Sequence, residues 1–173
     1  MKIYMLKSDI DNYKGCYLQD EKIDNSLVKV FNKGVELSVS PEVKFVYDKE
    51  TKNPAGDICE CYDCRGYFIS SKCETVLKNV SKIKAQFIHI NDDFILFNNL
   101  IVLDKLDKSK TDFKYFENDI LGVNKYCFED FDYPPVFQVT LPNGLTVRDY
   151  FVTEEFVKII EDNNLNGFLF EEI

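Results

Sequence analysis

Apolar and polar residues alternate along much of the chain, which is the period of a β-strand with one buried face. Three groups of apolar residues have this spacing: Val43, Phe45 and Tyr47, then Ile3 and Met5, then Ile88 and Ile90 on either side of His89. Runs rich in aromatic and β-branched residues predict further strands at 113–116, 120–128, 136–141 and 168–170.

Three stretches contain the residues that turns require. The polar run from 48 to 56 ends in Pro54-Ala55-Gly56, which predicts a surface loop between strands. Asn118-Asp119 separates two predicted strands, and Pro142-Asn143-Gly144 follows another. We therefore expect short strands joined by tight turns.

The pattern changes to a helical period after residue 70. Apolar residues then fall three or four positions apart, at Cys73, Val76, Leu77, Val80 and Ile83. Ser71, with Glu74 three residues later, matches a capping box, in which side chains satisfy the free amides at a helix start. The sequence predicts a helix beginning here.

A second helix is predicted after Val152. Thr153 is its expected N-cap, and Glu154 and Glu155 place negative charge in the first turn, where the helix dipole favours it. The expected buried stripe is Phe156, Ile159 and Ile160. The helix should end near 163–164, with Asn166-Gly167 supplying residues that tolerate positive φ before the last strand.

Many short strands and about two helices, without regular alternation, predict an α+β fold on a mainly antiparallel sheet. The chain has 173 residues, and domains rarely divide below about 250. We expect a single domain over 1–173, with a β-rich N-terminal part over 1–55. Hydrophobic residues make up 45% of the chain, which is enough for a core and excludes disordered classes.

The chain is acidic, with 21 Lys and Arg against 30 Asp and Glu and a net charge of −9. A field of this sign repels phosphate, so we expect no nucleic-acid and no membrane partner, and we expect a basic protein instead. The N-terminus lacks the apolar run of a signal peptide, and nowhere do about 18 apolar residues follow one another. We expect a cytoplasmic protein with reduced cysteines.

Cysteines gather at Cys59, Cys61 and Cys64, and Cys73 follows. Cys61-x-x-Cys64 matches half of a tetrahedral zinc site, in which Cys59 and Cys73 would have to supply the other two thiolates. The other interpretation is that these thiols are small buried side chains. We expect no metal and no cofactor, and a metal-binding structural or regulatory module is the alternative function.

His89 is the single histidine, so any Cys-His or Ser-His-Asp site must include it. Strand alternation places it opposite Ile88 and Ile90, exposed or half-buried. The sequence contains no dinucleotide, Walker, zinc-protease or nucleophile-elbow motif. We therefore expect no enzymatic activity, and a thiol enzyme that pairs His89 with a cysteine is a third hypothesis.

Acidic and aromatic residues alternate in the segment 128–135, which ends in Pro134-Pro135. Prolines keep such a segment loop-like, aromatic side chains supply binding energy, and carboxylates steer a basic partner. The residues predicted to contact a partner are Glu129, Asp130, Phe131, Asp132 and Tyr133. The alternative is a solvated loop in which Phe128 and Phe131 fill the core.

Short motifs are spread along residues 56–173. They are Gly56-Asp57, Ile69-Ser70-Ser71-Lys72, Val76-Leu77, Phe97-Asn98, Val102-Leu103-Asp104, Leu106-Asp107, Phe151-Val152-Thr153-Glu154-Glu155-Phe156, Leu165-Asn166-Gly167 and Phe170-Glu171-Glu172-Ile173. In these motifs the chain resembles a family of bacterial immunity proteins from polymorphic toxin systems, the eleventh catalogued family of this kind, formerly described as a domain of unknown function.

The resemblance implies a small cytosolic protein that binds a toxin domain and blocks it. It implies no catalytic residue, because the motif positions are those of caps, turns and core. Toxins that act on nucleic acid need basic surfaces, so an acidic inhibitor can use the electrostatics that its target uses for substrate. The sequence therefore predicts an immunity protein that neutralises a cognate toxin with a basic surface.

Overall fold

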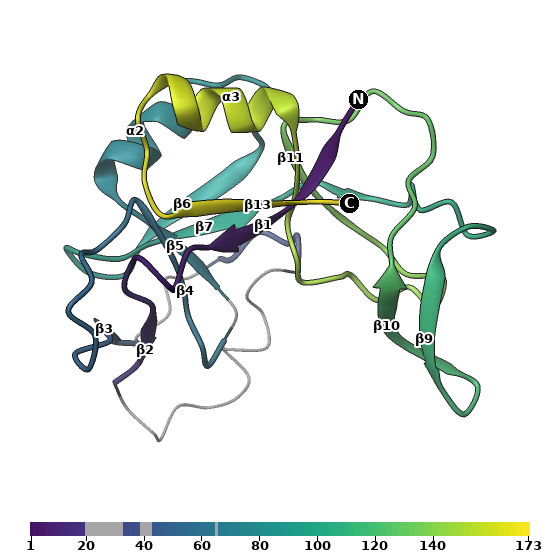
Figure 1. Cartoon of the computed structure of the whole chain (residues 1–173), viewed down its shortest axis with the longest axis horizontal. Helices are drawn as coiled ribbons and strands as arrows, with labels where there is room; N and C mark the ends of the chain where they lie inside the picture. The colour runs from purple at the N-terminus through teal and green to yellow at the C-terminus, as the bar shows by residue number, and fades with distance from the viewer. Residues whose placement is uncertain (20–32, 39–42, 65) are drawn as a thin grey trace.

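The computed structural model describes residues 1–19, 33–38, 43–64 and 66–173 (Figure 1). Part of the predicted β-rich N-terminal part, at 20–32 and 39–42, lies outside the described residues. Within the described ranges the chain forms two helices and thirteen strands, nearly all paired antiparallel. The predicted α+β class is confirmed.

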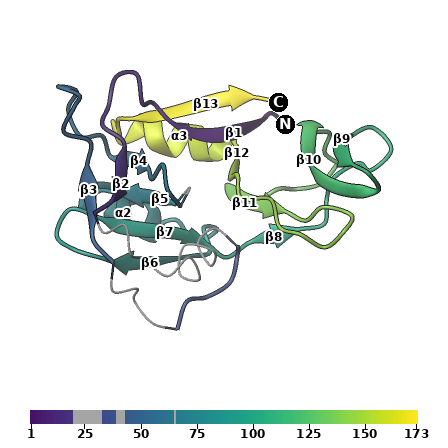
Figure 2. The same ribbon diagram turned by 90° about the horizontal axis from the view of Figure 1, so that it is seen from below.

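The largest sheet has five strands, with both ends of the chain lying side by side in it (Figure 2). Its order is β13 (Phe168–Glu172), β1 (Ile3–Ser8), β12 (Phe151–Thr153), β11 (Val136–Val139) and β8 (Val102–Leu103). Neighbouring strands run antiparallel except β11 and β8. Both faces of the sheet are covered by apolar side chains at β11 and β12, which explains why these strands are fully buried.

A four-stranded antiparallel sheet and two two-stranded sheets make up the rest of the described β structure. The sheet has the order β4 (Ile58–Glu60), β5 (Tyr67–Ile69), β7 (Ile95–Asn99) and β6 (Ala85–His89). One two-stranded sheet pairs β2 (Cys16–Leu18) with β3 (Phe45–Tyr47), and the other is a hairpin of β9 (Asp112–Phe116) and β10 (Asp119–Lys125). The two small sheets lie on opposite sides of the molecule in Figures 1 and 2. The loop predicted at 48–56 joins β3 to β4 and contains no strand, as expected.

Alternation of side chains divides the apolar residues into three cores. The central core fills the space where the larger sheets and the helices meet, and includes Leu6, Ile58, Cys73, Phe97, Val152 and Phe156. The thiol core covers the other face of the four-stranded sheet, and includes Cys16, Phe45, Cys59, Phe68 and Leu96. The hairpin core covers the other face of the five-stranded sheet, and includes Ile3, Phe113, Ile120, Phe137 and Phe151.

Two buried tyrosine hydroxyls join the larger sheets. Tyr150 donates to the carbonyl oxygen of Phe97 at 2.9 Å and accepts from the backbone amide of Asn99 at 3.0 Å. Tyr67 donates to the carbonyl oxygen of Leu6 at 2.7 Å. Buried backbone groups are costly to leave unpaired, so these bonds fix how the two sheets meet.

The first helix, α2 (Ser71–Lys78), begins one residue earlier than the predicted cap implies. Its N-cap is Ser70, whose Oγ accepts from the backbone amide of Cys73 at 3.1 Å. The prediction of Ser71 as the N-cap was therefore wrong, because Ser70 is the residue whose side chain accepts a hydrogen bond from the third amide of the helix. The helix ends at Lys78, so Ile83 reaches the central core from the turns that follow α2.

The second helix, α3 (Glu154–Asp162), has Thr153 at the predicted N-cap position. The side chain of Thr153 makes no capping bond, and its buried hydroxyl has no hydrogen-bond partner among the described residues. After the helix, positive φ occurs at Asn164 (50°) and Gly167 (87°), so Gly167 is confirmed in this role and Asn166 is not. The last strand extends two residues beyond the prediction, because β13 pairs with β1 as far as Glu172.

Both predicted hairpin turns exist, one of them shifted. Between β9 and β10 the turn residues are Glu117 and Asn118, with Glu117 at φ 53°, because Asp119 already pairs with Phe116. The turn at 142–144 is as predicted, with Gly144 at φ 83°. Turn chemistry located these hairpins, and strand pairing set the register.

Candidate functional site

Four cysteines gather in the thiol core, and they are not the four that the sequence suggested. Sγ of Cys59 lies 3.6 Å from Sγ of Cys16 on β2. Cys61 and Cys64 belong to the same core, whereas Cys73 lies in the central core on the other face of the sheet. Cys16 was missed because 42 residues separate it from Cys59, and only the pairing of β2 beside residue 61 brings it close.

Hydrogen bonds among the thiols set their ionisation. The thiols of Cys16 and Cys64 bond to Cys61 and, with the backbone amides of Cys64 and Asp63, hold the pKa of Cys61 below its ordinary value. Bonds to Cys59 and Cys61, with burial, raise the pKa of Cys16. Among the described residues, no group of three or more His, Cys, Asp or Glu side chains is placed to hold a metal ion.

His89 lies at the end of β6 with its side chain exposed, as the alternation predicted. Its Nε2 lies 3.0 Å from Oε1 of Glu74 on α2, on the face of the sheet opposite the thiol core. The structure therefore does not bring His89 to the four clustered cysteines. Glu74 is itself buried, and Lys78 completes an ion pair with it one helical turn later.

The Glu74 cluster predicts a pH dependence of stability. Burial alone would raise the pKa of the Glu74 carboxyl, but hydrogen bonds from Lys78 and His89 together outweigh it and lower the pKa below 4.5. A carboxyl whose pKa is lower in the folded state stabilises the fold above pH 4.5, and this contribution is lost as pH falls through the folded value. Between pH 6 and pH 3, the free energy of unfolding of the unchanged protein should fall by about 1 kcal/mol or less because of Glu74, and Glu74→Gln should lack this part of the fall. Denaturant unfolding of both proteins at each pH measures the difference. Equal pH dependence in the two proteins would contradict this expectation.

The acidic and aromatic segment 128–135 is divided between core and surface. Phe128 and Tyr133 pack in the hairpin core, and Tyr133 donates to the carbonyl oxygen of Glu129 at 2.9 Å. Tyr133 is only 5% exposed, so its side chain is closed to a partner in this conformation. Phe131 is 40% exposed and therefore does not fill the core.

The carboxylates of this segment differ in whether they form ion pairs. Glu129 pairs with Lys105 at 3.0 Å, and the same ammonium lies 5.1 Å from the centre of the Phe131 ring. Asp130 and Asp132 are exposed and form no ion pair within the described part of the chain. Of the five predicted contact residues, Tyr133 is thus buried, Glu129 is exposed but paired, and Asp130, Phe131 and Asp132 are exposed.

A second surface, at the β9–β10 hairpin, was not foreseen. Several of the large apolar side chains that remain exposed lie on or beside it: Tyr115 (59%), Phe116 (63%), Leu121 (61%) and Leu145 (60%). Leu121 is the extra residue of a β-bulge, since Ile120 faces Tyr115 while Gly122 faces Lys114. Bulges redirect side chains, and here the bulge turns a leucine outward.

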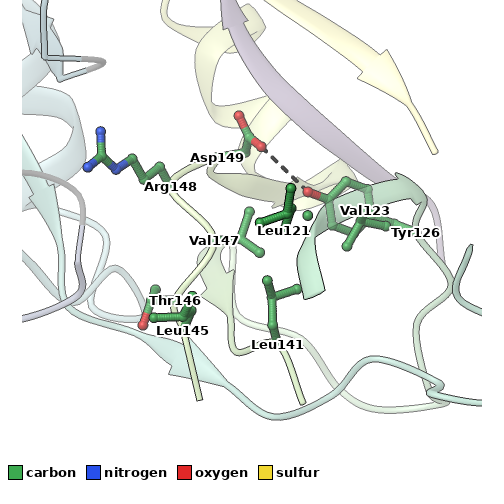
Figure 3. Close-up of a pocket in the computed structure, with 10 residues that line it drawn as sticks. Leu121, Val123, Tyr126, Leu141, Leu145, Thr146, Val147, Arg148 and Asp149 are labelled. Atoms are coloured by element: carbon green, nitrogen blue, oxygen red, sulfur yellow. Dashed lines mark hydrogen bonds between the residues drawn. The ribbon is translucent and has the colours of Figure 1, made fainter. Parts of the chain in front are cut away.

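A pocket of about 360 Å³ opens between β10 and the returning segment 145–149 (Figure 3). Its apolar walls come from Leu121, Val123, Leu141, Leu145 and Val147. Asn143 fixes the turn beside it by donating from Nδ2 to the carbonyl oxygen of Ile120 at 2.9 Å. The sequence did contain a signal for this surface, because Ile120 and Leu121 are adjacent apolar residues and cannot both face the core of one regular strand.

Polar groups stand at one end of the pocket. The hydroxyl of Tyr126 donates to Oδ2 of Asp149 over a long 3.5 Å, and this is the one hydrogen bond of that carboxylate within the described ranges. Burial, together with the nearby charge of Asp149, raises the pKa of Tyr126, so this hydroxyl stays protonated. Arg148 extends away from Asp149 in Figure 3. A pocket that combines leucine and valine side chains with an under-used carboxylate suits a ligand that has an aliphatic stem and a cationic end.

Several residues of the sequence motifs meet at one junction and act in folding. The carboxylate of Asp57 accepts from Oγ of Ser70 at 2.6 Å and from the backbone amide of Asn166 at 2.9 Å. Gly56 and Gly167 approach so closely that a Cβ on Gly56 would lie 3.2 Å from Cα of Gly167. These contacts join β4, the start of α2 and the loop before β13, so the motif residues there are structural.

No family model matches the chain, and no curated protein matches it. The resemblance to the immunity family therefore stays a prediction from the motifs. In the described part of the chain, neither helix has the length and apolar character needed to cross a bilayer.

Proposed function

We propose that this protein is an immunity protein, which binds a cognate toxin domain through its surface and thereby neutralises it. The observation that carries the proposal is the group of exposed apolar side chains, Tyr115, Phe116, Leu121 and Leu145, around the β9–β10 hairpin. Apolar side chains gathered at a surface are typical of protein interfaces, where aromatic residues contribute much of the binding energy.

Charge supports a basic partner for this interface. The net charge of −9 produces a field that accelerates encounter with a cationic surface. Asp130 and Asp132 add exposed carboxylates beside Phe131, whose ring is itself 40% exposed. We propose that this segment steers the toxin, while the apolar side chains of the hairpin supply contact area.

The direct test is co-expression with the protein encoded immediately upstream, a candidate toxin. Under the proposal, the two proteins purify together as one complex, and growth that the upstream protein alone arrests is restored. Failure of both copurification and rescue with every toxin encoded nearby would contradict the proposed function.

Charge reversal tests the steering segment. The double variant Asp130→Lys and Asp132→Lys should slow association with the toxin about three- to tenfold at low ionic strength, because steering depends on local potential. The control is Asp92→Lys and Asp93→Lys, which changes the net charge equally at the far end of β6. Stopped-flow association rates that fall equally in both variants would show that the segment has no special role.

A further inference from the structure

The pocket beside β10 has features that an acidic protein interface alone would not need. Its lining includes two exposed leucines, Leu121 and Leu145, which lie 24 residues apart in the sequence. The bulge at Leu121 and the bond from Asn143 to β10 hold these segments in place. The pocket is therefore formed by the fold of the free protein and does not depend on a partner.

The chemistry of the walls restricts what the pocket accepts. Leucine and valine side chains line part of the pocket and favour aliphatic carbon, which would leave water on entry, whereas much of the remaining lining is polar. The carboxylate of Asp149 at one end makes only the long 3.5 Å bond to Tyr126 within the described residues. A hydrogen-bond donor with a positive charge would give that carboxylate a short, charge-assisted bond.

Among protein side chains, lysine and arginine combine a flexible aliphatic stem with such a donor. Arg148 carries a like charge and also lines the pocket, but its side chain extends away from Asp149 in Figure 3. The overall charge of −9 adds attraction for a cationic partner. The lining and the charge of the protein therefore both favour a basic side chain in the pocket.

Resting on the proposed function, we infer that this pocket seats a lysine or arginine side chain of a basic protein partner. The aliphatic stem lies between Leu121, Leu145 and Val147, and the cationic end bonds to Asp149. Leu121 and Leu145 then contact apolar residues that flank this side chain in the partner.

A first experiment tests the pocket without any toxin. The full chain, with labelled methyl groups, is titrated with lysine methylamide acetylated on its α-amino group, so that the side-chain ammonium is free. A second titration uses the norleucine compound built in the same way, which has a similar stem and no charge. We expect the lysine derivative to shift the methyl resonances of Leu121, Leu145 and Val147. Its affinity should fall about tenfold in Asp149→Asn, and the norleucine derivative should bind both proteins equally weakly. Shifts elsewhere, no shifts, or equal affinity of the lysine derivative for both proteins would overturn the inference.

A second experiment uses the toxin that the protein neutralises. Asp149→Asn and Leu121→Ser should each weaken the complex about tenfold, whereas Arg148→Gln, a matched change at the adjacent residue, should not weaken it. Thermal unfolding of each variant verifies that the fold is kept, as expected for changes at exposed or half-buried side chains.

The two experiments separate the inference from the proposed function. If the toxin binds and the pocket variants bind as tightly as the unchanged protein, the pocket inference is overturned and the immunity function stands. If no toxin binds but the lysine derivative occupies the pocket as described, the cation specificity of the pocket stands and the immunity function does not.

Discussion

Replacing Phe151 by alanine is expected to lower the free energy of unfolding by about 3–5 kcal/mol, because a large buried ring is lost and a cavity remains. Phe151 is fully buried at the centre of the hairpin core, with ring centres of Tyr126 at 4.8 Å, Phe128 at 5.2 Å and Phe137 at 5.8 Å. Denaturant unfolding measures the loss directly.

The matched control for this substitution is Phe131→Ala, in the same core region but at the surface. Phe131 contacts Tyr133 at a ring distance of 5.2 Å and the ammonium of Lys105, yet 40% of it is exposed. Its removal should cost about 1 kcal/mol or less. Equal losses in the two variants would mean that Phe131 fills the core, as the alternative interpretation of the segment supposed.

The second large effect is expected for Gly167→Val, which should lower the free energy of unfolding by about 2–6 kcal/mol. Gly167 has φ 87°, a conformation that β-branched residues rarely adopt. A Cβ there would also lie 3.1 Å from the carbonyl oxygen of Ile58 and 3.3 Å from Cα of Gly56. Neither neighbour can move easily, because both belong to the backbone beside β4.

A substitution at Gly144 distinguishes the cost of the positive φ from the cost of the close backbone contacts. Gly144 has φ 83°, but a Cβ at this position would meet nothing within 4 Å. Gly144→Val should therefore show only the conformational cost, about 1–3 kcal/mol. If Gly144→Val is as damaging as Gly167→Val, the close approach between Gly56 and Gly167 contributes nothing to stability.

The candidate binding surfaces could be predicted from the sequence only in part. Acidic residues alternating with aromatic ones drew attention to 128–135, but a sequence does not say which rings of such a segment enter a core. The structure buries Tyr133, because its hydroxyl reaches the carbonyl oxygen of Glu129 and its ring stacks on Phe137 at 4.8 Å. For the exposed leucines of the pocket, the sequence offered only the adjacent apolar pair Ile120 and Leu121, which does not say which of the two faces outward.

By itself, the sequence determined part of the local structure of this protein, although it did not predict β4, β5, β7, β8 or β12. Alternation of period two placed strands such as β1, β3 and β6, helical spacing placed α2 and α3, and Gly144 and Gly167 marked positions of positive φ. It also determined the net charge, and with it the sign of the field around the molecule. These properties depend on residues close in the chain or on simple addition, so they need no knowledge of packing.

Only the tertiary structure decided which distant residues meet. It brought Cys16 to Cys59 and left Cys73 in another core, and it built a pocket from Leu121 and Asp149. The pairing of strands far apart in sequence and the bulge in β10 set these encounters. Such pairing is selected by the free energy of burying whole sheet faces together, a property of the complete fold that no local pattern contains.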